Sequence, residues 1–399
     1  MIAKLRSNRV RRTYLGGGRI DAFTGGPRFS ASGAETAVPH ADATERVPPM
    51  PRPEDWLAST TTAFNGTLEI EGEGLGRLED GRLVKDVVGE LPILVKLLDS
   101  DERLVIQAHP TVPCAKRLFG SPVGKTECWY FLPGTAEDAC VYLGFKPGVT
   151  RTAWEKAVRA EMEDNRQPAA SNRTVEPSNC RTGCRLSNAD RPASTSLLSF
   201  LHRIPVKAGD FVFVDGGMPH AIGGGCFMVE LQEPSDLMVV AERFTPSGRR
   251  IPDAKMHGGV GWERMFDVYE YEGLSFKDVC RRYVRRGLSH KEELFTNDNC
   301  HNCSQIANTN LCASASLREA YCICGPELTD KFAMWRVMGG GSVVLPRDCA
   351  VAVVTGGNGE VNGLPAKKGD RLLIADDCRI DVSGDLALIV CACPVTIQS

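Results

Sequence analysis

Two histidines, a glutamine and a glutamate in this chain have the residue types and spacing of a metal site. Gln107 and His109 flank one alanine in a strand-like segment, so a strand would point both side chains to one face. Glu127 follows in a second strand-like segment, and His220 comes after a strand pattern and a tight Gly-Gly turn. Two imidazoles, a carboxylate and an amide oxygen suit Zn²⁺ or another divalent first-row ion. The alternative is that each histidine is an ordinary buried or surface side chain.

The segments around these residues have the length and composition of β-strands. Strand-length runs rich in β-branched and aromatic residues cover 92–98, 104–108, 128–132, 139–145, 198–206 and 210–214. From Tyr321 to the end, short strands alternate with turn signals at a spacing of roughly 8–12 residues. The sequence therefore predicts a mainly β protein built from sandwiches or barrels.

Helical and polar segments divide these strands. Apolar residues recur with helical period near 150–163, and residues 261–285 also have helical character. Residues 164–195 are polar and rich in Pro, Ser and Asn, which is typical of a surface insertion. We expect a first domain over 1–294, a polar connector over 295–320 and a C-terminal β domain over 321–399.

The metal-site segments also resemble a known family. The stretch Gly209–His220 resembles the second cupin motif, with Asp215 where proline is usual. The order Q-x-H and then K-x-E resembles the altered first motif of type I phosphomannose isomerases. Further matching stretches are 56–60, 94–98, 127–130, 219–223 and 230–236. The resemblance runs from about residue 10 to the C-terminus, with 164–195 as an insertion. It implies two cupin (jelly-roll β-barrel) domains with a small helical and loop insertion between them.

The resemblance implies an activity and roles for individual residues. Members of this family interconvert mannose 6-phosphate and fructose 6-phosphate through an enediol(ate). By this match, the metal ligands are Gln107, His109, Glu127 and His220, holding one Zn²⁺ per chain. Lys125 and Asp236 fall on positions proposed for acid/base chemistry or substrate contact. For Lys125, a solvated turn lysine is an equally good interpretation.

Two positions depart from the family pattern. The family carries an arginine four residues after the position of Asp236, and this chain has Val240 there. Arg243 is the nearest cation, but on a regular strand it would face the opposite side, and only a bulge would restore its direction. Val105 stands where the family usually has serine. We expect Arg243 to be the catalytic arginine if such a bulge exists.

Binding of a sugar phosphate requires fixed cations or backbone amides. Lys96 lies on a strand that enters the expected pocket, and Arg249 follows the turn Thr-Pro-Ser-Gly. These two residues are the predicted substrate-binding cations, although a solvated loop explains Arg249 slightly better. The departures at Val240 and Val105 leave two other functions open: a cupin that binds metal and a sugar or sugar phosphate without turnover, and an isomerase or epimerase for another sugar.

Composition limits the remaining classes. The chain has 399 residues, 42% of them hydrophobic, and a formal net charge of −3, which excludes disorder as the dominant state. A long basic run is absent from the sequence after the first dozen residues, and its apolar runs are only strand-sized. We therefore expect no nucleic acid and no membrane as partners, whereas the family resemblance implies a small-molecule sugar phosphate as partner. We also expect a cytoplasmic location and a monomer or homodimer.

The 16 cysteines offer a competing metal site. Cys300 and Cys303 form a CxxC pair that could join Cys322 and Cys324 around a structural zinc. However, the second pair lies in a strand-like run, where cysteine often behaves as a small hydrophobic residue. In a reducing compartment most of these thiols are expected to be free.

Overall fold

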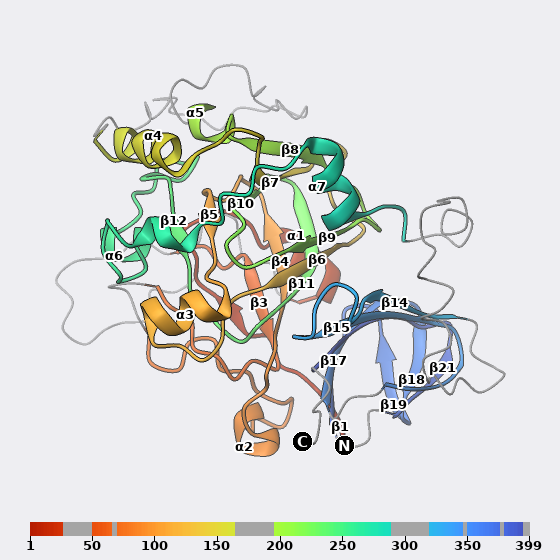
Figure 1. Cartoon of the computed structure of the whole chain (residues 1–399). Coiled ribbons are helices and arrows are strands. Elements are labelled where there is room, and N and C mark those ends of the chain that lie inside the picture. Colours follow the sequence, from red (N-terminus) through yellow and green to blue (C-terminus); the bar gives the residue numbers. More distant parts are fainter. Residues whose placement is uncertain are drawn as a thin grey trace, which may run out of the picture.

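The computed structural model describes residues 1–26, 50–65, 70–163, 195–288, 319–345, 349–375 and 379–393. Two β-rich bodies lie side by side, with the C-terminal strands gathered beside the larger N-terminal body (Figure 1). Each body contains two antiparallel sheets. None of the described helices is both long and apolar enough to cross a membrane.

The first body contains a seven-stranded and a five-stranded sheet. The larger sheet has the order β13-β9-β6-β11-β4-β3-β2 and the smaller has the order β12-β5-β10-β7-β8. The strands of the larger sheet are β2 (Arg9–Val10), β3 (Glu54–Leu57), β4 (Leu94–Ser100), β6 (Glu127–Phe131), β9 (Phe211–Val214), β11 (Cys226–Gln232) and β13 (Val284–Arg285). Those of the smaller sheet are β5 (Gln107–Ala108), β7 (Cys140–Phe145), β8 (Leu201–Pro205), β10 (His220–Ile222) and β12 (Val239–Val240).

The C-terminal body also contains two sheets. The six-stranded sheet has the order β1-β20-β17-β22-β15-β14 and the four-stranded sheet the order β16-β21-β18-β19. Their strands are β1 (Ile2–Lys4), β14 (Glu319–Cys324), β15 (Ala333–Met338), β16 (Gly341–Val344), β17 (Cys349–Gly356), β18 (Asn358–Val361), β19 (Leu364–Lys367), β20 (Arg371–Ala375), β21 (Arg379–Gly384) and β22 (Ala387–Ala392).

The N-terminal strand crosses the domain boundary expected from the sequence. Ile2 pairs with Ile374, so β1 lies on the edge of the C-terminal sheet (Figure 1). Residues 2–4 thus pair with the C-terminal sheet, while the expected first domain over 1–294 stays a prediction. The unpaired backbone groups of an edge strand can bind a strand from any part of the chain. The local pattern of residues 2–4 therefore does not reveal which sheet these residues join.

The helices lie around the first body. They are α1 (Gly18–Thr24), α2 (Val84–Val88), α3 (Val112–Phe119), α4 (Arg151–Glu163), α5 (Thr195–Leu198), α6 (Asp253–Met256), the 3₁₀ helix η2 (Met265–Val268) and α7 (Phe276–Tyr283). The helix expected near 150–163 is α4. The helical region expected at 261–285 is instead split, because Ser275 caps a new helix by accepting a hydrogen bond from the Asp278 amide.

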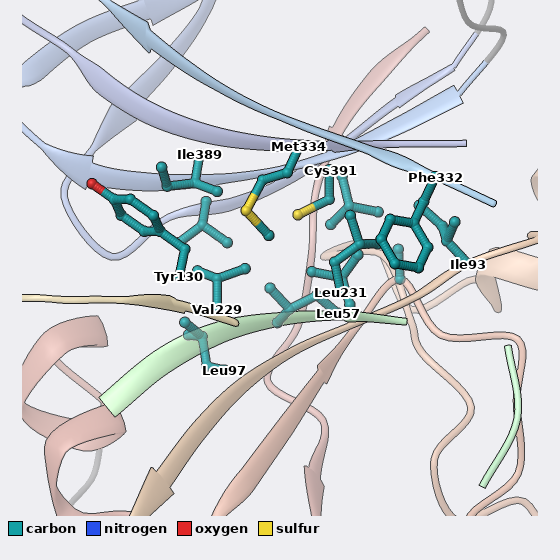
Figure 2. Close-up of a cluster of buried hydrophobic side chains, with 14 of the residues drawn as sticks. Leu57, Ile93, Leu97, Tyr130, Val229, Leu231, Phe332, Met334, Ile389 and Cys391 are labelled. Carbon is teal, nitrogen blue, oxygen red and sulfur yellow. The ribbon is translucent and has the colours of Figure 1, made fainter. Parts of the chain in front are cut away.

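A hydrophobic core joins the two bodies. Leu57, Val229 and Leu231 of the first body meet Met334 and Cys391 of the second in one buried cluster (Figure 2). Successive side chains of a strand point to opposite faces of its sheet. Along β11, Val229 and Leu231 therefore join this cluster, whereas Met228 joins the core inside the first body. The larger sheet of the first body therefore packs through one face on the six-stranded C-terminal sheet.

Candidate metal centre and the adjoining cavity

Three metal-ligating side chains converge between the two sheets of the first body. His109 follows β5 and His220 begins β10, both in the five-stranded sheet, whereas Glu127 begins β6 of the facing sheet. Nε2 of His109 lies 3.3 Å from Oε2 of Glu127, and Nε2 of His220 lies 3.3 Å from its Oε1. The three ligand atoms lie within 4.8 Å of one another, and all three side chains are buried.

Sheet pairing places Gln107 beside this cluster. Gln107 is the direct cross-strand partner of His220, and its amide nitrogen lies 3.3 Å from Nε2 of that histidine. Rotation about the last side-chain bond exchanges the oxygen and nitrogen of an amide, so the Gln107 oxygen can face the same point. The structure thus brings together all four residues that the sequence suggested as metal ligands.

A glycine turn ties the two histidine segments together. Gly217 has φ +85°, and its amide donates a 2.6 Å hydrogen bond to the carbonyl of His109. A Cβ at this position would lie 2.3 Å from Cγ of Glu270, so a side chain is excluded by space as well as by backbone conformation. The Gly-Gly turn before His220 is therefore a structural requirement for the cluster.

Hydrogen bonds orient both imidazoles toward the centre. Nδ1 of His109 lies 2.9 Å from the Leu237 carbonyl, and Nδ1 of His220 lies 2.9 Å from the Met218 carbonyl. A carbonyl only accepts, so each Nδ1 carries the proton and each Nε2 presents a lone pair. This arrangement of outer partners is the one that fixes metal-bound histidines.

Electrostatics keep these donors in the protonation states that bind a cation. Burial, reinforced by the positive charge of Lys125, lowers the pKa of His109 to about 3, and burial also lowers the pKa of His220. Burial alone would raise the pKa of Glu127, but the nearby Lys125 and His109 outweigh it and hold that pKa well below its usual range. Two neutral imidazoles therefore face one carboxylate.

The donor set fits a divalent first-row cation. Oε2 of Glu127 is buried and accepts no hydrogen bond from the described residues, although Nζ of Lys125 lies 3.2 Å away. Two imidazole lone pairs, a carboxylate and an adjacent amide are a ligand set that zinc accepts. Among the described residues this is the sole cluster of three His, Cys, Asp or Glu side chains close enough to hold a metal ion.

Lys125 connects the cluster to a neighbouring cavity. Its Nζ lies 2.9 Å from Nε2 of His109, and the side chain is buried. Lys125 and Gln107 are also part of the cavity wall. The cavity volume is about 40 Å³, room for a few waters. Its other charged lining residues are Arg12, Glu54, Lys96, Glu230, Asp236 and Lys255.

Asp236 and Lys96, both predicted site residues, line this cavity but are already paired. Asp236 accepts hydrogen bonds from Arg12 at 3.1 Å and from the Phe64 amide at 2.9 Å. Nζ of Lys96 donates to Glu230 at 2.6 Å. Both side chains are therefore held in place by buried ion pairs, which fixes the shape of the cavity wall.

Arg243 and Arg249 lie outside the cavity wall. Strand β12 pairs with β5 in regular register, with Val239 opposite Ala108 and Val240 opposite Gln107, so the register shows no bulge as far as Val240. Arg243 instead forms an ion pair with Asp253 and lies over the Trp262 ring. Arg249 is half-buried in the turn that follows Thr245, and its amide donates to the Thr245 hydroxyl.

Val240 and Val105 give the cavity an apolar side. Val240 is buried with Ile251 and Met256, and Val105 packs against the same cluster. Both valines line the cavity. The two valines noted in the sequence thus present hydrophobic surface beside Gln107.

Three charged residues of the cavity carried no local signal in the sequence. Arg12 and Glu54 belong to separate N-terminal segments and meet through a 3.0 Å hydrogen bond. Lys255 lies on the four-residue helix α6. A hydrophobic or motif pattern would not single out any of them, because their importance comes from contacts between segments far apart in the chain.

The alternative cysteine site is only partly within the described residues. Cys300 and Cys303 lie outside them. Cys324 is buried on β14 and packs in the core between the two bodies, together with Cys128 and Cys391. These described cysteines are free thiols that contribute to packing.

Comparison with solved structures identifies the fold. The chain superimposes on mannose 6-phosphate isomerase from Bacillus subtilis with a TM-score of 0.61 and 16% identity, covering 98% of this chain and 99% of that one. This is the fold of the phosphomannose isomerases. A zinc-bound mannose 6-phosphate isomerase gives a TM-score of 0.60 at 13% identity, covering 98% and 99% of the two chains. The mainly β, cupin fold predicted from the sequence is confirmed.

Sequence comparison points the same way over a shorter segment. Mannose-6-phosphate isomerase ManA of Bacillus subtilis is 28% identical over 145 residues. That alignment covers 36% of this chain, and it spans about a third (35%) of the relative. No family model matches the chain. The resemblance to phosphomannose isomerases is thus confirmed, by the fold over the whole chain and by sequence over part of it.

Proposed function

We propose that this chain is a metal-dependent aldose–ketose isomerase that interconverts mannose 6-phosphate and fructose 6-phosphate. The observation that carries the proposal is the convergence of His109, Glu127 and His220 on one buried point, in the fold that mannose 6-phosphate isomerases share. Aldose–ketose isomerisation needs a cation to stabilise negative charge on substrate oxygens and a base to move a proton between C1 and C2.

The chain's own residues divide these tasks. Gln107, His109, Glu127 and His220 would hold one divalent ion, with Zn²⁺ the best fit to the donors, and the ion would supply Lewis-acid stabilisation of the substrate oxygens. Nζ of Lys125 is the basic group placed between this cluster and the cavity, so we assign it the proton transfer.

The ion-paired residues would position the substrate. Asp236 holds Arg12, and Glu230 holds Lys96, each pair at the cavity wall. The cytoplasmic location and the monomer or homodimer remain predictions from the sequence.

A coupled assay of fructose 6-phosphate formation tests this proposal. Purified protein should convert mannose 6-phosphate, lose that activity after treatment with a chelator and regain it when zinc is restored. Unphosphorylated mannose and glucose 6-phosphate are the substrate controls. The variant Lys125→Met should lose at least about 100-fold in kcat, whereas Lys116→Met, on the exposed face of α3, should retain full activity.

One observation favours a second candidate, a cupin that binds a sugar phosphate without converting it. Val240 places a hydrophobic side chain next to Gln107, at the edge of the metal cluster. If zinc-loaded protein binds mannose 6-phosphate by calorimetry but forms no fructose 6-phosphate, the isomerase proposal is wrong and this second function stands.

A further inference from the structure

Lys255 is a buried lysine whose amine has no hydrogen-bond or ion-pair partner among the residues that the structure describes. Its side chain is 5% exposed and lines the cavity beside the metal cluster. Its amine makes no hydrogen bond or ion pair with any residue in the described part of the chain. Burial of an unpaired ammonium is costly, and a buried titratable group of this kind in a cavity wall is a candidate for ligand binding.

The other cations of the cavity are already engaged. Arg12 pairs with Glu54 and Asp236, and Lys96 pairs with Glu230. Lys125 contacts Glu127. Of the described lining residues, Lys255 is thus the one cation whose side chain forms no hydrogen bond or ion pair.

Helix α6 holds Lys255 against the metal-bearing sheet. The helix packs on β12, and Met256, the next residue, is buried against Val240 of that strand. Asp253, the first residue of α6, forms ion pairs with Arg243 and Arg250. Apolar packing of Met256 and the ion pairs of Asp253 thus hold the helix in place, and they set the position of Lys255.

We propose that Lys255 binds an anionic oxygen of the substrate in this cavity. The inference deepens the proposed function, because it assigns a residue that contacts the sugar phosphate. An ammonium donates up to three hydrogen bonds and has no acceptor, so it suits a phosphate or an enediolate oxygen. Both groups are anionic oxygens, and the experiment below separates them.

The charge state of Lys255 agrees with this role. Burial lowers its pKa to about 8, and Arg12 adds to the decrease, while Asp236 and Glu54 oppose it. At neutral pH the amine is still mostly protonated. An anion that enters the cavity would therefore meet a positive charge that is not ion-paired with any carboxylate of the described residues.

The test compares Lys255→Met with the exposed-lysine control Lys116→Met in the zinc-loaded, full-length protein. One arm measures the affinity for inorganic phosphate by calorimetry, and the other measures kcat and KM for mannose 6-phosphate. If Lys255 holds the phosphate group, the Met variant weakens phosphate binding and raises KM on the order of 10- to 100-fold. If it contacts the enediolate, kcat falls by a similar factor and phosphate affinity is unchanged.

Unchanged phosphate affinity together with unchanged kcat and KM would overturn the inference. Lys255→Arg, which keeps the charge, should retain part of the affected parameter, whereas a purely structural role would make Arg as harmful as Met. If Lys255→Met does not fold, Lys255→Gln is used in its place in both measurements. Wild-type protein that binds phosphate through Lys255 but makes no fructose 6-phosphate would refute the isomerase proposal alone.

Discussion

Replacing Lys255 by methionine is expected to stabilise the protein at neutral pH. The side chain is 5% exposed, and its amine is unpaired among the described residues, so the folded state carries the cost of a buried charge. Methionine has a similar length and no charge, and it would pack against the apolar side of the cavity formed by Val240, Ile251 and Met256.

The magnitude follows from the pKa of Lys255. Its pKa is about 8 in the folded protein, against an ordinary value of 10.5. At 1.36 kcal/mol per pH unit, this difference corresponds to about 3 kcal/mol lost by the folded state at pH 7. Methionine would not pack perfectly in the cavity, and this offsets part of the gain. The expected increase in unfolding free energy is therefore about 1–3 kcal/mol.

The pH dependence has a definite sign. Between pH 8 and 10.5 the unfolded chain keeps the lysine proton and the folded chain has released it, so wild-type stability rises with pH in this window. Burial lowers the folded pKa of Lys255 most; Arg12 and Lys125 lower it further, and Asp236 and Glu54 raise it. The Met variant lacks this contribution, so its advantage is largest below pH 8 and shrinks above it.

Urea unfolding of the two proteins at pH 7 and pH 9.5, with the same zinc concentration, measures this difference. Lys116→Met is the control and should match the wild type at both values. A Met variant that is less stable at pH 7, or whose advantage stays constant between the two pH values, would refute the reasoning.

Three further variants test other parts of the structure. Leu231→Ala, in the core between the two bodies, should lower the unfolding free energy by about 2–5 kcal/mol, measured by urea denaturation. Asp236→Asn leaves buried Arg12 with one carboxylate partner and should cost about 3 kcal/mol; a loss below 1 kcal/mol would contradict the buried pair. Arg249→Met lies outside the cavity wall, so KM for mannose 6-phosphate should change less than about twofold; a tenfold rise would return Arg249 to the substrate site.

The metal cluster could be predicted because its signals are local. Gln107 and His109 are two residues apart on one strand, and a glycine turn precedes His220, so short patterns specify their directions. The facing position of Glu127 follows once the two sheets are known. The same holds for the strand runs, whose composition alone indicates the fold class.

The cavity wall could not be predicted in the same way. Arg12 meets Asp236 across more than two hundred residues of sequence, and β1 joins a sheet made by the last third of the chain. Lys255 belongs to a single helical turn whose sequence has no periodic pattern. Such contacts depend on packing between distant segments, which local propensity and spacing do not encode.

Zinc titration of the metal-free protein, with the rate of fructose 6-phosphate formation as readout, tests the central claim most directly. If His109, Glu127 and His220 form the metal centre of an isomerase, the rate should rise in proportion to added zinc and level off at one ion per chain. The variant His109→Ala/His220→Ala should show neither tight zinc binding nor conversion. Full activity without metal, or no conversion at any zinc ratio, would contradict the account.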